Sequence, residues 1–161
     1  MAGGLLWFAE KLSRLMNVIA YTALTFIMLL TVSDVVLRSF KHPIIGTFEM
    51  VGMGGAVVIG FGIPLTSWLR GLIYVDFVIQ KFPSWGKNTI NILTRVVCIA
   101  LFVVIGYNLF IYATDLYKSG EVSLTRQIPF YPVAYGLGFS CLVQCLVLIA
   151  DIIKVIGGKY E

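Results

Sequence analysis

Four long stretches of the chain contain no Asp, Glu, Lys or Arg. They cover residues 15–33, 50–69, 96–114 and 127–150. The hydrocarbon core of a bilayer is about 30 Å thick, which about 20 residues of α-helix can cross. Each stretch is long enough, so we predict an all-α integral membrane protein with four transmembrane helices and short connections, forming one membrane domain over residues 1–161. We place the spans at about 15–37, 47–69, 90–114 and 128–153.

The charge content supports this class. Charged residues make up 12% of the 161 residues, against about 25% in soluble domains. The short connections leave no room for a soluble catalytic or sensory domain, so the function must lie in or at the bilayer. The formal net charge of +4 is spread between the apolar runs, so membrane lipids are expected partners and nucleic acid is not.

The distribution of Lys and Arg residues predicts the orientation of the chain in the membrane. Eight lie in the N-terminus, the middle connection and the C-terminus, and four lie in the other two connections. This bias predicts that both termini are cytoplasmic. The N-terminal segment is expected to lie along the membrane before it turns into the first span. The middle connection is either an amphipathic helix in the interface or an extension of the two spans beside it.

Few polar side chains lie within the spans, and ionisable ones there are functional candidates. Asp34 stands four residues before Arg38, so the two can form an ion pair on one helix face. The alternative for Asp34 is a proton or cation site. Asn108 and Gln144 are mid-span amides that need hydrogen-bond partners, either from another helix of the bundle or from a substrate.

Catalytic and metal-binding patterns are missing from the sequence. His42 is the single histidine. One histidine cannot supply two axial haem ligands or form a histidine metal site within the chain. No Ser/His/Asp set or Gly-rich phosphate loop is present. Three cysteines, Cys98, Cys141 and Cys145, are interpreted as small packing residues. We therefore expect no enzyme activity, no bound metal and no cofactor.

Small residues in the second uncharged run predict a helix contact. Gly52, Ala56 and Gly60 recur at intervals of four, a spacing that lets another helix approach closely. The stripe does not say whether that helix belongs to this chain or to another. Pro64 can kink the same helix. We expect the fourth span to begin near Ile128, because Pro129 or Pro132 in its first turn suits a helix start.

Several short motifs follow one another in a characteristic order. They are Arg38 at the end of the first span, "PIIGTFEM" with Pro43, Gly46 and Glu49 before the second, "VD" at Val75 and Asp76, "FP" at Phe82 and Pro83, and "IP" at Ile128 and Pro129. On a four-span chain this order resembles the DctQ-like small membrane subunit of tripartite ATP-independent periplasmic (TRAP) transporters. Leu72 and Ile73 depart from the pattern, because members often carry a histidine shortly before the "VD".

The resemblance implies a division of labour. A soluble periplasmic binding protein would deliver an organic anion, a carboxylate or sulfonate, to a large multi-span subunit that holds the substrate and coupling sodium sites and moves like an elevator. This chain would be a static, non-catalytic scaffold in the bacterial or archaeal inner membrane that holds the large subunit and helps to dock the binding protein. Candidate structural or partner-contact residues are Asp34, Arg38, Pro43, Gly46, Glu49, Gly52, Ala56, Gly60, Asp76 and Pro129.

Glu49 is the carboxylate at the start of the second span. An anionic side chain there interacts favourably with the free N–H groups of the helix. Arg38 emerges at the same membrane face, so the two could pair and fix the first hairpin, or Glu49 could contact a partner subunit. Two other functions remain open: a small homodimeric four-helix exporter, and a membrane-anchor subunit of a respiratory complex.

Overall fold

The computed structural model describes residues 2–69 and 84–156, which contain four α-helices. These are α1 (Ala2–Ser39), α2 (Thr47–Trp68), α4 (Ser84–Ser119) and α5 (Tyr131–Ile156). All four are long and apolar enough to cross a membrane, which confirms the predicted all-α membrane fold. Residues 70–83 of the middle connection, with Asp76, lie outside the described residues, so neither interpretation of this connection is tested.

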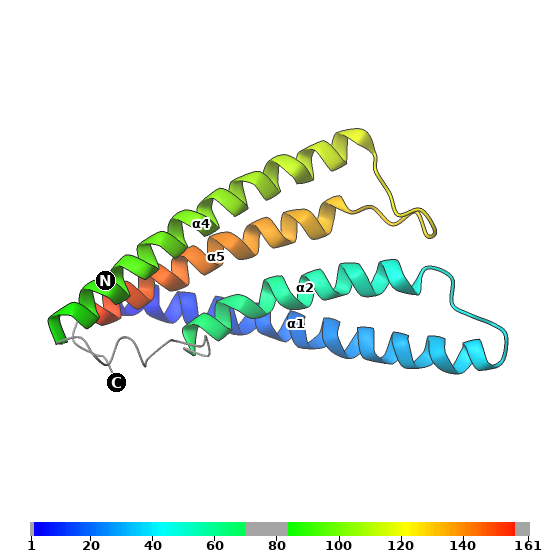
Figure 1. Ribbon diagram of the computed structural model, residues 1–161, viewed down its shortest axis with the longest axis horizontal. Coiled ribbons are helices and arrows are strands. Elements are labelled where there is room, and N and C mark those ends of the chain that lie inside the picture. The colour runs from blue at the N-terminus through cyan, green and yellow to red at the C-terminus, as the bar shows by residue number, and fades with distance from the viewer. Residues whose placement is uncertain (1, 70–83, 157–161) are drawn as a thin grey trace.

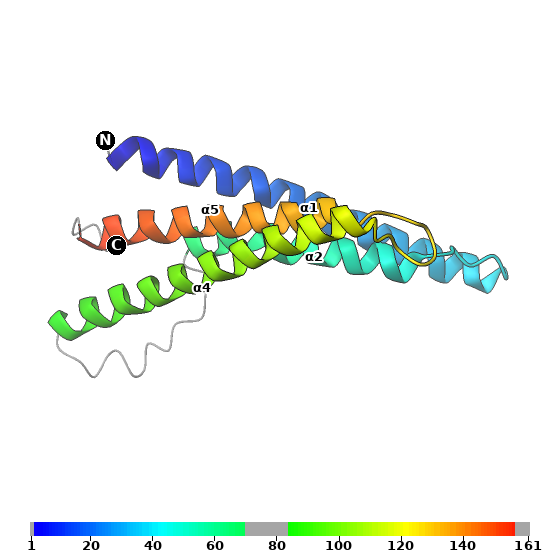
Figure 2. The ribbon, with the colours of Figure 1, turned by 90° about the horizontal axis from the view of Figure 1, so that it is seen from above.

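The helices form two hairpins that meet at one end and diverge toward the other (Figure 1). Helix α1 packs on α2, and α4 packs on α5. Helix α5 joins the hairpins, because it also contacts α1 and α2. Figure 2 shows it running between α1 and α4. Half of the α5 span is buried, against about a tenth or less of the other three, so α5 is the core of the bundle.

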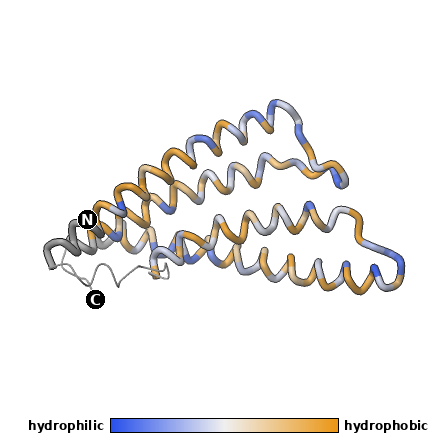
Figure 3. The backbone as a smooth tube through the Cα atoms, in the orientation of Figure 1, coloured by the Kyte–Doolittle hydropathy of each residue, from blue (hydrophilic) through white to orange (hydrophobic). Residues whose placement is uncertain are grey.

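Polar residues mark the end of the bundle at which the hairpins diverge. The 40–46 and 120–130 connections lie at the diverging end, which we call the loop end (Figure 1). Hydrophilic residues gather at the tips of these connections, and apolar residues run along the helices (Figure 3). Such a distribution is typical of helices that cross hydrocarbon and return through a polar interface.

Helix α1 is continuous from Ala2 to Ser39, so the predicted turn between an interfacial segment and the first span is wrong. The N-terminal part continues the helix because it packs on the bundle. Ala9 is buried with Val147 and Ala150 of α5, and the buried Ser13 hydroxyl donates to the Ala9 carbonyl at 2.6 Å. At about 1.5 Å a residue, the 38 residues make α1 far longer than the bilayer core.

Small residues let α4 and α5 approach closely. A Cβ atom on Gly106 would lie 3.2 Å from the Cβ of Cys141, and one on Gly138 would lie 3.2 Å from the Phe110 ring. The three cysteines are free thiols, and Cys141 lies at this contact, as predicted for packing residues. Neither Gly106 nor Gly138 was predicted as a contact from the sequence.

Helix α2 uses its glycines on two faces. Gly54 faces α1, where an added Cβ would lie 2.8 Å from Ile27 Cδ1. Gly60 packs directly against Leu137 of α5. Pro64 has no N–H to donate to the Gly60 carbonyl four residues earlier, and the Ser140 hydroxyl of α5 donates to that carbonyl instead. The predicted contact stripe is therefore an internal contact at Gly60.

The other end of the stripe is open, since no described atom outside the neighbouring backbone of α2 lies within 4 Å of a Cβ built on Gly52. We expect Gly60→Leu to lower the free energy of unfolding by about 1–3 kcal/mol through overpacking against Leu137. Gly52→Leu, the matched control, should change it by less than about 0.5 kcal/mol. Unfolding by detergent titration measures both, and equal stability of the two variants would contradict the assignment.

Helix α5 begins at Tyr131, later than the predicted Ile128. The preceding residues are held in a small turn, because Val122 and Pro129 form an antiparallel bridge and the Ile128 carbonyl accepts the Ser123 N–H at 2.9 Å. Pro129 is thus part of the loop, and Pro132 takes the first-turn position of the helix.

Candidate functional site

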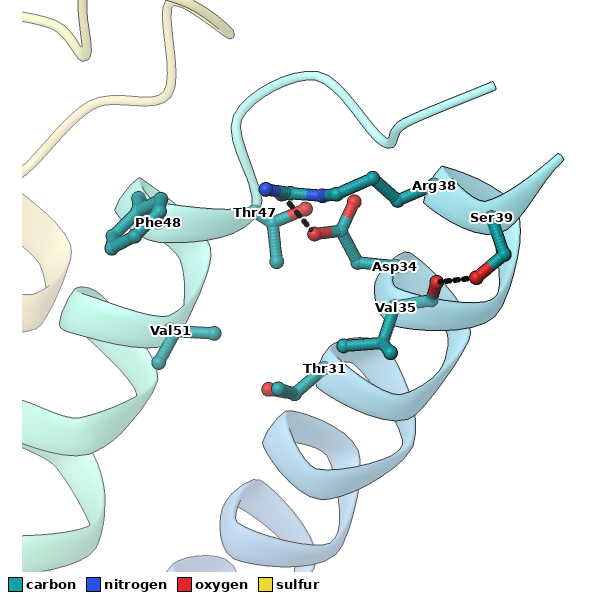
Figure 4. Close-up of a pocket in the computed structure, with 8 residues that line it drawn as sticks. All are labelled: Thr31, Asp34, Val35, Arg38, Ser39, Thr47, Phe48 and Val51. Atoms are coloured by element: carbon teal, nitrogen blue, oxygen red, sulfur yellow. Dashed lines mark hydrogen bonds and ion pairs between the residues drawn. The ribbon is translucent and has the colours of Figure 1, made fainter. Parts of the chain in front are cut away.

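The turn between α1 and α2 is organised by the Asp34 carboxylate. Arg38 donates from Nη2 to Asp34 Oδ2 at 2.6 Å, which confirms the predicted ion pair. The Ile44 N–H donates to the other oxygen at 2.8 Å, and the Thr47 hydroxyl donates to the Ile44 carbonyl at 2.9 Å. Asp34 is only 5% exposed, so its carboxylate joins the end of α1 to the entry of α2 (Figure 4).

Gly46 lies where this turn enters α2. Its φ angle is +86°, a left-handed conformation that favours glycine. A Cβ atom at this position would also lie 2.7 Å from Arg126 Cγ. Gly46 is therefore needed both for the backbone conformation and for the approach of the second loop, whereas Pro43 is exposed in the turn.

Glu49 joins the two loops. Its Oε1 accepts hydrogen bonds from the Thr125 N–H at 3.1 Å and the Thr125 hydroxyl at 2.8 Å, and its Oε2 accepts one from Ser123. Ser123 is 2% exposed. Nearby, Arg126 Nε donates to the Ile45 carbonyl at 2.9 Å. We call Glu49, Ser123, Thr125, Arg126 and the Ile45 carbonyl the loop clamp.

The loop clamp corrects the sequence interpretation of Glu49. The suggested Arg38–Glu49 pair does not form, because Arg38 binds Asp34 and Glu49 binds the 120–130 connection. Sequence reasoning missed Ser123, Thr125 and Arg126. Their signal was weak: three polar side chains within four residues, "SLTR", in a connection that folds back on itself. Only the tertiary fold brings that run, more than 70 residues away in the chain, to Glu49.

Two hollows flank these contacts. One, of about 500 Å³, is lined by Asp34, Arg38, Thr47 and Phe48 with neighbouring side chains of α1 and α2 (Figure 4). The other, of about 370 Å³, opens among α2, α4 and α5, and its lining is mostly apolar and includes Glu49, Gly52, Ala56, Leu109, Val133 and Leu137. The outer members of the predicted stripe, Gly52 and Ala56, thus face a hollow.

Toward the other end, α5 carries two polar contacts. Arg95 of α4 donates from Nε and Nη2 to Asp151 Oδ2 at 2.7 and 2.6 Å, and both side chains are almost fully buried. Gln144 donates to the Ser67 hydroxyl of α2 at 2.6 Å, which confirms the predicted hydrogen bond within the bundle for this amide. Asn108 is exposed and donates to the Val104 carbonyl of its own helix, so the corresponding prediction for it is wrong.

The Arg95–Asp151 pair was missed, although its signal was present. Arg95 directly precedes one uncharged run and Asp151 directly follows another, and consecutive antiparallel spans bring those two ends to the same membrane face. Arg95 was interpreted only as a charge that flanks a span. Within the described residues, no group of three or more His, Cys, Asp or Glu side chains is placed to hold a metal ion.

A comparison with known protein families identifies the family of this chain. The sequence model for the DctQ component of tripartite ATP-independent periplasmic transporters matches residues 27–158. The chain belongs to the DctQ family. It is a multi-pass membrane protein and the small permease component of a TRAP transporter, as the resemblance of its motifs implied. No curated protein and no solved structure gives a significant match.

The matched region contains all the contacts described at the loop end, from Asp34 to the loop clamp. It also contains Arg95, Gln144 and Asp151. The first 26 residues lie outside the match, and among them Ala9 of α1 packs on α5. In this DctQ chain, the elements that hold the hairpins together therefore lie mostly within the family region.

Proposed function

We propose that this chain is the static scaffold of a TRAP transporter. It holds a large elevator-type permease subunit in the inner membrane and helps to dock the periplasmic binding protein. The transporter imports an organic anion, a carboxylate or sulfonate, and is driven by a sodium gradient whose ions bind to the large subunit. The substrate class and the sodium coupling rest on the family membership alone.

The observation that carries the scaffold role is the loop clamp. Three hydrogen bonds to Glu49 and one from Arg126 tie the α1–α2 turn to the α4–α5 loop, and toward the other end the Gln144–Ser67 hydrogen bond ties α5 to α2. A chain held at both ends of its bundle resists relative movement of its hairpins, which is what a fixed support for a moving subunit requires.

The orientation is part of the same proposal. Both termini are cytoplasmic by the distribution of Lys and Arg, which places the loop end in the periplasm. There the exposed side chains of Phe48 and Leu124 stand beside the clamp. Large apolar side chains exposed at a polar interface are available to a docking protein or to the large subunit.

Reconstitution tests the scaffold role. The large subunit and the binding protein are placed in liposomes with and without this chain, and uptake of labelled substrate is followed with an inward sodium gradient. We expect uptake only when the chain is present, and the chain should co-isolate with the large subunit from detergent. Equal uptake without the chain would contradict the proposal, and uptake that persists without sodium would contradict the coupling.

A further inference from the structure

The outward face of α4 carries an exposed row of side chains with regular spacing. We call it the α4 seam; its members are Val97, Leu101, Val104, Asn108, Ile111, Asp115 and Lys118, and all are exposed. Successive members are four and three residues apart in alternation. This 4–3 spacing is the heptad pattern by which one helix packs along another at a small crossing angle.

The α4 seam takes no part in packing among the described helices. With 3.6 residues per turn, its members lie on the side opposite Arg95, Gly106 and Ala113, and these three are buried. Gly106 and Arg95 contact α5. The α4 seam therefore points away from the bundle, toward lipid or another protein.

The hydrogen bonding of Asn108 indicates whether lipid or another protein covers the α4 seam. Its Nδ2 donates to the Val104 carbonyl at 2.8 Å, while its Oδ1 accepts no hydrogen bond from any described residue. Asn108 is eleven residues from the end of α4 at Ser119, or about 16 Å along the helix. Hydrocarbon at that depth offers no donor, and an unsatisfied amide there is costly.

Exposed hydroxyl residues of α1 provide the contrast. Thr22, Thr25 and Thr31 each donate to a carbonyl of their own helix at 2.8–3.0 Å. A hydroxyl has a single proton and is satisfied in this way, so these residues are compatible with a lipid-facing surface. A primary amide has two protons and an acceptor, and one bond to its own helix leaves the rest of Asn108 unpaired.

Asp115 adds a charge to the same row. It follows Asn108 by seven residues, two helical turns, and its exposed carboxylate makes no ion pair with a described residue. Beside it is a hollow of about 350 Å³ lined by Tyr107, Phe110, Ile111, Thr114, Asp115 and Lys118. The hollow is large enough to receive a side chain from a facing helix.

We propose that the α4 seam is the surface on which a transmembrane helix of the large permease subunit packs. That helix carries a hydrogen-bonding side chain level with Asn108 and a cationic or donor group near Asp115, and its apolar side chains cover Leu101, Val104 and Ile111. The identity of the partner rests on the proposed function. The position and polarity of the contact rest on the spacing and on the two unpaired polar groups.

Competition for the large subunit tests the seam. Differently tagged wild-type and variant chains are co-expressed with it, and the amount of each retained is measured after detergent extraction. We expect Asn108→Leu to be retained about three- to tenfold less than wild type, and Asn108→Leu with Asp115→Leu less still. Val103→Leu is the matched control, because Val103 is exposed on the same helix but lies off the seam, and its retention should equal that of wild type.

If Asn108 only stabilised the fold of this chain, Asn108→Leu would lower the melting temperature of the isolated chain. Asn108 is exposed and its side chain donates to a carbonyl of its own helix, so the isolated Asn108→Leu chain should melt at the wild-type temperature or above it. Equal retention of all variants would overturn the proposal, as would a lower melting temperature that accounts for the loss. If the wild-type chain does not retain the large subunit, the proposed function is contradicted as well. If the wild-type chain retains it and the seam variants retain it equally well, only the proposal for the α4 seam is contradicted.

Cross-linking identifies the occupant directly. A photoreactive amino acid in place of Ile111 should give an adduct with the mass of this chain plus the large subunit. An adduct with a second copy of this chain would make the seam a homodimer contact, and an adduct with lipid alone would make it a lipid-facing surface. Either of these results would overturn the proposal.

Discussion

Replacing Arg95 with leucine should lower the free energy of unfolding of the chain by about 3–5 kcal/mol, because it leaves the Asp151 carboxylate buried without its guanidinium partner. The two side chains are 7% and 12% exposed, so water cannot compensate well for the loss. Unfolding of the purified chain by detergent titration, followed by circular dichroism, measures the change.

Two controls separate the ion pair from other effects. The double variant Arg95→Leu with Asp151→Leu should regain most of the lost stability, since a buried pair replaced by apolar residues is often neutral. Arg14→Ala breaks the ion pair with Glu10, in which Arg14 is 69% exposed, and should cost less than about 1 kcal/mol. A double variant as unstable as the single one would show that the charges are not the cause.

Glu49→Ala should release the 120–130 connection, because it removes all three hydrogen bonds that the carboxylate accepts. The Thr125 amide donates directly to Glu49, so its hydrogen exchange should become about tenfold faster or more. Sodium-driven uptake should fall strongly in the reconstituted transporter, since the loop end loses its fixed geometry.

Graded and matched variants sharpen this test. Glu49→Gln should lie between wild type and Glu49→Ala, because the amide oxygen can still accept from Thr125 while the second acceptor is lost. Glu121→Ala is the matched control: it removes an exposed carboxylate from the same loop, and exchange at Thr125 should not change. Unchanged exchange in Glu49→Ala would contradict the loop clamp.

The prediction of local contacts from the sequence was reliable where the partners are close in the chain. Asp34 and Arg38 lie one helical turn apart, so helix geometry alone brings them together. Gln144 and Ser67 are distant in the chain, and only the presence of a mid-span amide indicated that a partner must exist. The corresponding prediction for Asn108 was wrong, because an exposed amide can donate to a carbonyl of its own helix, as Asn108 does to Val104.

The sequence could not assign faces to the helices. The stripe of Gly52, Ala56 and Gly60 was recognised as a contact, but only Gly60 packs closely on α5, where Ser140 also satisfies the carbonyl freed by Pro64. A spacing of four defines a row on a helix, and it contains no information about which neighbour covers each part of that row.

The sequence by itself determined the four spans, the membrane location and the family, because the length of an uncharged run and the order of short motifs are properties of the chain alone. The tertiary structure decided that Glu49 binds Ser123 and Thr125 instead of Arg38, and that Arg95 is buried against Asp151. These contacts depend on how two hairpins are placed relative to each other. Apolar packing around α5 sets that placement, and packing is not directional enough to be read from residue type and spacing.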